Sequence, residues 1–212
     1  MQQRVVTPIV LEQDARVISE YAAVAKTFAH TFHIDIIDGM YADNITVAPA
    51  DLQEVDLSPL AVDIHLLVDD PVEWIPECVA LSPTRIFAQI EKMGSIDHYI
   101  ATLREHPGVG VGLGLGIHTP LSELTDEILK NVDGIILMSI EAGFSGNPFL
   151  PTVLPRITEL RARYDGAIII DGGINVEHAR SCFAAGASEV GANSFLWKGN
   201  PVENYQKLLE VL

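Results

Sequence analysis

Short apolar runs alternate along this chain with segments that have helical spacing. The runs are almost continuously apolar, which is typical of parallel strands buried on both sides. The segment after the first run places Val17, Tyr21, Val24 and Phe28 on one stripe, which predicts an amphipathic helix. Strands are predicted at 5–11, 33–38, 60–68, 85–90, 109–115, 132–139, 167–171 and 189–192. Helices are predicted at 13–28, from Pro71, at 96–104, from Pro120, and at 149–164, 176–184 and 202–211.

Eight strands that alternate with helices predict a (β/α)8 TIM barrel, with a doubly wound open sheet as the alternative. The chain has 212 residues, fewer than the roughly 250 of a common barrel, so short loops are expected. No linker, low-complexity segment or change of composition divides the sequence. We therefore expect residues 1–212 to form one barrel domain.

Composition narrows the classes of function. The net charge of −16 argues against a nucleic-acid partner and against an anionic membrane surface. A small anionic substrate is still allowed, because backbone amides can bind a phosphate locally. The only two cysteines, Cys78 and Cys182, are far apart and lack metal-ligand spacing. With no signal segment and no apolar run of 18 residues, we expect a cytoplasmic protein with reduced cysteines.

Polar side chains interrupt the apolar runs close to the carboxyl ends of the strands, where a TIM barrel has its active site. His33 and Asp35 lie on one side of their strand, so both can reach one cation. His65 and Asp171, from two other strands, are expected to converge on the same point. Two imidazoles and two carboxylates suit Zn²⁺, Mn²⁺, Fe²⁺ or Co²⁺ better than Ca²⁺ or Mg²⁺. A hydrogen-bond network without metal is the structural alternative.

Glycines supply candidates for an anion site. The segments 143–146 and 171–173 follow the sixth and seventh strands, and glycine lets backbone amides approach a phosphate closely. Two ordinary glycine turns are the alternative. The alternating glycines at 108–116 do not fit a dinucleotide motif and predict a strand with one bare face, inside the barrel or under a helix. His118, beyond the fifth strand, is a further candidate for the site, whereas the histidines at 30, 98, 106 and 178 are predicted to lie in loops or on the surface.

Four motifs together give the sequence a resemblance to a known family. They are His33-Ile34-Asp35-Ile36-Ile37-Asp38-Gly39 with Asn44-Ile45-Thr46, Asp63-Ile64-His65-Leu66-Leu67-Val68, Met138-Ser139-Ile140-Glu141-Ala142-Gly143-Phe144-Ser145-Gly146, and Ile170-Asp171-Gly172-Gly173-Ile174. The chain resembles the ribulose-phosphate 3-epimerase family over nearly its whole length. The resemblance implies a (β/α)8 barrel that inverts carbon 3 of a pentulose 5-phosphate with one divalent transition metal, Zn²⁺ as first choice and Fe²⁺, Mn²⁺ or Co²⁺ as alternatives.

The resemblance also implies roles for individual residues. His33, Asp35, His65 and Asp171 match the metal ligands, and Asp35 and Asp171 match the two acid/base carboxylates. Asp38 matches a residue interpreted as supporting the ligands without contacting the metal. The implied substrate and phosphate positions are His65, Gly143, Phe144, Ser145, Gly146, Gly172, Gly173, Asn193 and Ser194.

Several positions depart from the family pattern, and all lie around the substrate. Ile9 replaces a substrate-contacting Ser, Met40 stands where a His is usual, and Asn193 replaces a glycine of the phosphate loop. Ala142 and Ser145 replace a Pro and a Gly, and the segment 116–119 has lost an Asn-Pro-x-Thr pattern. The same chemistry on another ketose phosphate, such as a ketohexose 6-phosphate, is therefore an alternative to the pentulose.

Two other functions compete with the epimerase. The first is a non-catalytic barrel that binds a sugar phosphate, which the changed Ser favours and the intact carboxylates oppose. The second is a decarboxylase or aldol-type synthase, but those enzymes use Asp-x-Lys-x-x-Asp and here His65 stands where the Lys would be. The expected partners are a phosphorylated ketose and further copies of this chain in a homo-oligomer.

Overall fold

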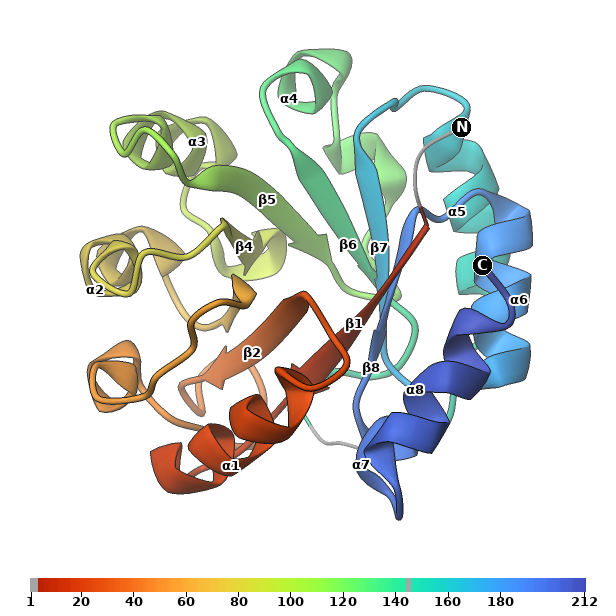
Figure 1. Cartoon of the computed structure of the whole chain (residues 1–212). Helices are drawn as coiled ribbons and strands as arrows, with labels where there is room; N and C mark the ends of the chain where they lie inside the picture. Colours follow the sequence, from red (N-terminus) through yellow and green to blue (C-terminus); the bar gives the residue numbers. More distant parts are fainter. Residues whose placement is uncertain (1–3, 144–145) are drawn as a thin grey trace.

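Eight parallel strands close into one barrel in chain order, with the helices outside it (Figure 1). The structure is a computed structural model that describes residues 4–143 and 146–212. The strands are β1 (Val5–Val10), β2 (Thr31–Ile37), β3 (Ala61–Leu67), β4 (Arg85–Gln89), β5 (Gly110–Leu115), β6 (Gly134–Met138), β7 (Ala167–Asp171) and β8 (Glu189–Ala192). Because β1 pairs with both β2 and β8, the predicted (β/α)8 barrel is confirmed and an open sheet is excluded.

Helices cover the outside of this barrel. They are α1 (Ala15–Ala25), α2 (Ile75–Val79), α3 (Ile96–Arg104), α4 (Asp126–Lys130), α5 (Val153–Arg161), α6 (Val176–Ala185), α7 (Ser194–Trp197) and α8 (Pro201–Leu209). Short 3-10 turns are η1 (Pro49–Leu52), η2 (Pro71–Trp74), η3 (Ile90–Lys92) and η4 (Leu121–Glu123). No helix of the described ranges is long and apolar enough to cross a membrane.

Three predicted helices begin several residues later than the sequence pattern indicates. The helix predicted from Pro71 is a 3-10 turn there, and α2 begins at Ile75. The helix predicted from Pro120 is only a 3-10 turn there, and α4 begins at Asp126, where the Thr125 side chain accepts the amide hydrogen of Ile128. The helix predicted from Phe149 begins at Val153 as α5. Phe149 instead stacks on His178, with ring centroids 4.1 Å apart. The short α7, between β8 and α8, has too few residues to show helical periodicity.

Alternation along the strands separates two kinds of core. Ile34 and Ile36 belong to the large apolar core between the barrel and its helices. A smaller cluster, which includes Phe87, Ile136 and Ile169, is separate from that core. Its members share the strand side of His33, His65 and Asp171, which point into the barrel. The barrel interior is therefore apolar at mid-height and polar toward the carboxyl ends.

The glycines of β5 leave room inside the barrel, which decides between the two places that the sequence allows. A Cβ on Gly112 would lie 2.1 Å from the ring of Phe87, and one on Gly114 would lie 2.7 Å from the amide nitrogen of Gln89. Both neighbours come from β4, whose residues pair with these glycines. The bare face of β5 is thus filled by the inward side chains of β4.

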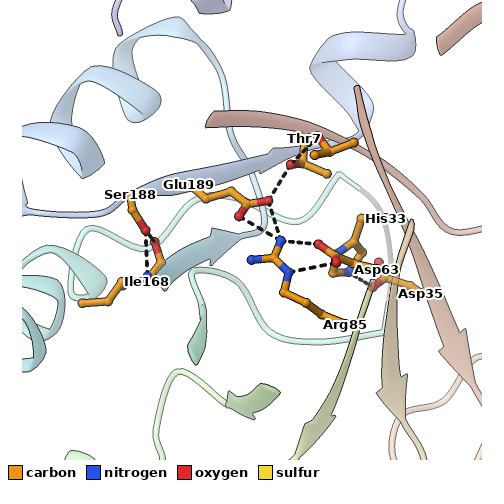
Figure 2. A network of polar contacts seen from close by, with 9 residues as sticks. Thr7, His33, Asp35, Asp63, Arg85, Ile168, Ser188 and Glu189 are labelled. Carbon is orange, nitrogen blue, oxygen red and sulfur yellow. Dashed lines mark hydrogen bonds and ion pairs between the residues drawn. The ribbon is translucent and has the colours of Figure 1, made fainter. Parts of the chain in front are cut away.

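An ion network fills the amino-terminal half of the barrel (Figure 2). Arg85, the first residue of β4, donates to both carboxylate oxygens of Asp63 and, over 3.0 Å, to Oε2 of Glu189. Thr7 donates to Glu189 over 2.5 Å. Asp63 and Glu189 are buried, so Arg85 neutralises charge that would otherwise be costly inside the protein. This network supports the barrel below the carboxyl ends of the strands.

Candidate active site

Four ligand candidates converge at the carboxyl ends of three strands. His33 and Asp35 come from β2, His65 from β3, and Asp171 is the last residue of β7. One donor atom from each lies within 4.8 Å of the others, and all four residues are buried. The sequence prediction that these side chains meet is therefore correct.

Hydrogen bonds join the four side chains. The Oδ1 atom of Asp35 lies 3.1 Å from Nε2 of His33 and 2.9 Å from Nδ1 of His65. The same Nδ1 atom lies 3.6 Å from Oδ2 of Asp171. His65 Nδ1 thus lies near two carboxylates that come from the non-adjacent strands β2 and β7.

The two carboxylates have different electrostatic environments. Burial alone would raise the pKa of Asp35, but hydrogen bonds from His33 and His65 outweigh it and lower this pKa to about 2. Burial and the nearby charge of Asp35 raise the pKa of Asp171 above its ordinary value. Burial would lower the pKa of His65, but its hydrogen bonds to Asp171 and Asp35 raise it to about 9. Opposite shifts in two neighbouring acids are typical of a proton donor and acceptor pair.

The donor set also fits a divalent cation. Two imidazole nitrogens and two carboxylates from a buried, preassembled group are ligands that first-row transition metals accept. Two buried acids side by side repel one another unless a proton or a cation lies between them. The same group of residues can therefore form the hydrogen-bond network or hold a divalent cation.

A pocket opens above these side chains. It contains about 500 Å³ of empty space, part of it continuous with solvent. Asp35 and Asp171 line it, and so do Ile9, Leu67 and Met138. Six of the predicted phosphate positions also line it: Gly143, Gly146, Gly172, Gly173, Asn193 and Ser194. Of the other three predicted substrate and phosphate positions, His65 is not among the residues that line the pocket, and Phe144 and Ser145 lie outside the described residues.

Two of these glycines are required by their backbone. Gly172 and Gly173 have φ of +114° and +62°, in the region that favours glycine. A Cβ on Gly173 would lie 2.8 Å from the backbone nitrogen of Phe149, and one on Gly172 would lie 2.4 Å from Ile140. The segment after β7 can therefore pass close to the loop after β6 and leave backbone amides at the pocket wall.

Side chains from neighbouring loops tie this wall together. Asn44 donates to the carbonyl of Gly143 over 2.8 Å, which joins the loop after β2 to the loop after β6. Ser139 donates to the carbonyls of Asp171 and Gly172. His178, predicted as a loop or surface residue, stacks on Phe149 and its Nδ1 lies 2.7 Å from the carbonyl oxygen of Gly173. It therefore fixes the segment that follows β7.

Asp38 and His118 lie at the edge of the site. Asp38 accepts hydrogen bonds from the amides of Met40, Tyr41 and Asp69, so it holds two loops rather than a ligand side chain. His118 is mostly exposed and lies 2.7 Å from Glu141. It lines a separate depression and is not among the residues that line the central pocket.

Gln89 is a residue to which the sequence pattern assigned no role. It ends β4, is fully buried, and its Nε2 atom lies 3.0 Å from Nε2 of His65. In the sequence, only its position at the end of a predicted strand could have indicated a place in the site. Its orientation toward a metal-ligand candidate appears only in the structure.

Comparisons with known proteins agree with this geometry. The sequence model of the ribulose-phosphate 3 epimerase family matches residues 5–197. The chain is 30% identical over 200 residues to ribulose-phosphate 3-epimerase of Bacillus subtilis, with 91% of each chain covered. It is 33% identical over 204 residues to the protein of that name from Mycobacterium leprae, with 88% of each covered. The Escherichia coli K12 protein is 29% identical, with 99% of this chain and 95% of that protein covered.

Solved structures share the fold at lower identity. A mutant tryptophan synthase α-subunit from Pyrococcus furiosus superposes with a TM-score of 0.74 at 12% identity, covering 99% of this chain and all of the other. Thiamine phosphate pyrophosphorylase from the same organism gives 0.61 at 13% identity, with 98% and 94% covered. These likenesses support the barrel alone. The family match and the relatives, together with the convergent strand-end residues, show that this chain belongs to the ribulose-phosphate 3-epimerase family of isomerases.

Proposed function

We propose that the protein inverts carbon 3 of a ketose phosphate, converting D-ribulose 5-phosphate to D-xylulose 5-phosphate or acting on a related ketose. One observation carries the proposal. Asp35 and Asp171, from the non-adjacent strands β2 and β7, line one pocket whose wall also contains the glycine segments after β6 and β7. A substrate whose phosphate lies on these glycines presents its sugar carbons to both acids.

The two carboxylates suit the required proton movements. The hydrogen on carbon 3 is acidic because carbon 2 is a ketone, and inversion needs its removal from one face and a proton delivered to the other. Asp35, with its lowered pKa, is ionised and is the base in one direction. In the group without a metal, burial and the charge of Asp35 raise the pKa of Asp171 and favour its protonated form, so we assign Asp171 as the acid in that direction. The reverse reaction exchanges the two roles.

We further propose that His33, Asp35, His65 and Asp171 hold one divalent transition metal, with Zn²⁺ as first choice. Fe²⁺, Mn²⁺ and Co²⁺ accept the same donors. A bound cation would supply positive charge where negative charge develops on the substrate oxygens. Ligation would also keep both carboxylates in place relative to the substrate.

A change at Asn193 tests the phosphate position. Asn193→Asp keeps the size of the side chain but adds a negative charge at the pocket wall, so it should repel the substrate phosphate. We expect KM to rise by about tenfold or more with a smaller change in kcat, measured by steady-state kinetics. Asn200→Asp, at the amino end of α8, is the matched control. Equal KM values for the two variants would place the phosphate elsewhere.

Ile9, like Asn193, is a departure from the family pattern that lines the pocket. It is buried, lines the pocket, and packs over Gly191, where a Cβ would lie 2.2 Å from the Ile9 Cδ1 atom. Ile9→Ser would enlarge the pocket and add a hydroxyl, so we expect kcat/KM to shift toward the pentulose phosphate. A pocket change of this size is worth about 1–3 kcal/mol. Unchanged relative kcat/KM for pentulose and ketohexose phosphates would exclude Ile9 as a determinant of specificity.

The reaction itself can be tested directly. The metal-loaded protein is incubated in D₂O with a panel of ketose phosphates, and NMR detects deuterium at carbon 3 together with the epimeric product. Both signals are expected for at least one ketose. If no ketose phosphate exchanges or turns over, while isothermal titration still shows binding, the barrel is a sugar-phosphate binder instead.

A further inference from the structure

Gln89 has an incomplete set of hydrogen bonds in a fully buried position. Its amide Nε2 lies 3.0 Å from Nε2 of His65. Its Oε1 atom has no hydrogen-bond partner among residues 4–143 and 146–212. An orphaned amide oxygen at this depth is costly, and it lies in the side chain that contacts a ligand candidate.

The chemistry of His65 indicates how the amide is used. Nδ1 of His65 faces Asp35 and Asp171, so this nitrogen is the one that a shared cation would meet. A neutral imidazole that binds a cation through Nδ1 carries its proton on Nε2. That N–H points at Gln89 and needs an acceptor. An amide rotated by 180° places its oxygen there, at almost no change in shape.

Each orientation of the amide matches one state of His65. With the amide nitrogen toward His65, the ring accepts at Nε2 and must carry its proton on Nδ1, between the two carboxylates. With the amide oxygen toward His65, the ring donates from Nε2 and leaves the Nδ1 lone pair for a cation. Only the second orientation is compatible with metal binding at Nδ1.

The neighbouring strand makes the room for this amide. Gly114 of β5 pairs with Gln89, and a Cβ there would lie 2.7 Å from Nε2 and 2.8 Å from Cδ of Gln89. The bare position thus lets the amide lie flat against β5 and reach His65. Gly114, one of the alternating glycines at 108–116, therefore has a structural role beside Gln89.

We propose that Gln89 is a positioning residue that accepts the Nε2–H of His65 and so presents Nδ1 to the metal, with Gly114 providing its slot. The inference rests on the metal site proposed above. Partners of metal-bound histidines typically contribute 10–100-fold to metal affinity. Gln89 therefore affects the metal through His65 and without contacting it.

Metal affinity measured by chelator competition with Zn²⁺ tests the proposal. Gln89→Leu removes the acceptor at similar size and should weaken Zn²⁺ binding by about 10–100-fold. Gln89→Glu keeps an acceptor oxygen and should bind Zn²⁺ at least as tightly as the wild type. Thr7→Val, a buried change in the amino-terminal half of the barrel interior, is the control and should leave the affinity unchanged.

Ring nitrogens of ¹⁵N-histidine report the hydrogen bond itself in the Zn²⁺-loaded protein. The wild type and Gln89→Glu should show a low-field Nε2–H proton for His65, and Gln89→Leu should move it to higher field. Gly114→Ala should weaken Zn²⁺ binding as Gln89→Leu does. Gly94→Ala, where no described atom lies within 4 Å of the new methyl group, should not.

The outcomes separate this inference from the metal site. If wild-type protein binds no Zn²⁺, the metal site and the role of Gln89 both fail. If it binds Zn²⁺ and Gln89→Leu binds equally well, or Leu and Glu variants weaken equally, only the role of Gln89 fails. If Gln89→Leu does not fold, the wild-type spectrum decides, because an Nδ1–H signal from metal-loaded His65 would overturn the proposal.

Discussion

Asp35→Asn and Asp171→Asn should each lower kcat for epimerisation by about 10²–10⁴-fold, the usual effect of losing a positioned acid or base. Each substitution removes one proton carrier but keeps an oxygen of similar position. In the proposed mechanism one carboxylate faces each side of the substrate carbon, so neither can replace the other. Lost metal affinity would add to the effect, so Zn²⁺ content is measured on each variant.

Deuterium exchange distinguishes the two acids. Each variant keeps one base, so it should still exchange the carbon-3 hydrogen of one epimer with D₂O while failing to form the other. The two variants should favour opposite epimers, supplied separately as the ribulose and xylulose phosphates. Asp97→Asn, an exposed acid on α3, is the control. Wild-type turnover in both active-site variants would disprove the two-carboxylate mechanism.

The fold was accessible from sequence because each strand is an almost continuous apolar run between helical segments. Parallel strands buried on both faces leave this signal even without homologues. The first residues of the helices were harder to predict. The sequence pattern places the start of α5 at Phe149, whereas α5 begins at Val153 and Phe149 stacks on His178. Such a contact joins residues distant in sequence, and no local pattern encodes it.

The candidate metal ligands could be predicted for a different reason. His33, Asp35, His65 and Asp171 are polar groups in apolar strands, near the ends that meet in any TIM barrel. Gln89 occupies a similar strand end but has no charge, so its type alone suggested no chemistry. Its role depends on the orientation of an amide against His65 and on the bare face of Gly114, which are features of three-dimensional packing.

The second large effect is on stability, and it concerns the ion network in the amino-terminal half of the barrel. Arg85→Leu would leave Asp63 and Glu189 buried without their cation. Removing one partner of a buried ion pair typically costs 3–5 kcal/mol, because the other charge stays in a poor solvent. We expect a loss of this size in the free energy of unfolding at pH 7, measured by urea denaturation. Arg104→Leu breaks a half-exposed pair with Asp133 and should cost at most about 1 kcal/mol.

The pH dependence of the Arg85→Leu variant identifies the cause of that loss. Burial already raises the pKa of Asp63 although Arg85 opposes it, so removing Arg85 should raise this pKa further. A carboxyl group whose pKa is higher in the folded than in the unfolded protein binds more protons when folded. Stability then falls as pH rises from about 3.9, the ordinary value for the unfolded chain, through the raised folded pKa. The gap between variant and wild type should therefore be smallest near pH 4 and widen toward pH 7. A gap that does not change with pH would attribute the loss to packing around the Arg85 side chain rather than to unpaired charge.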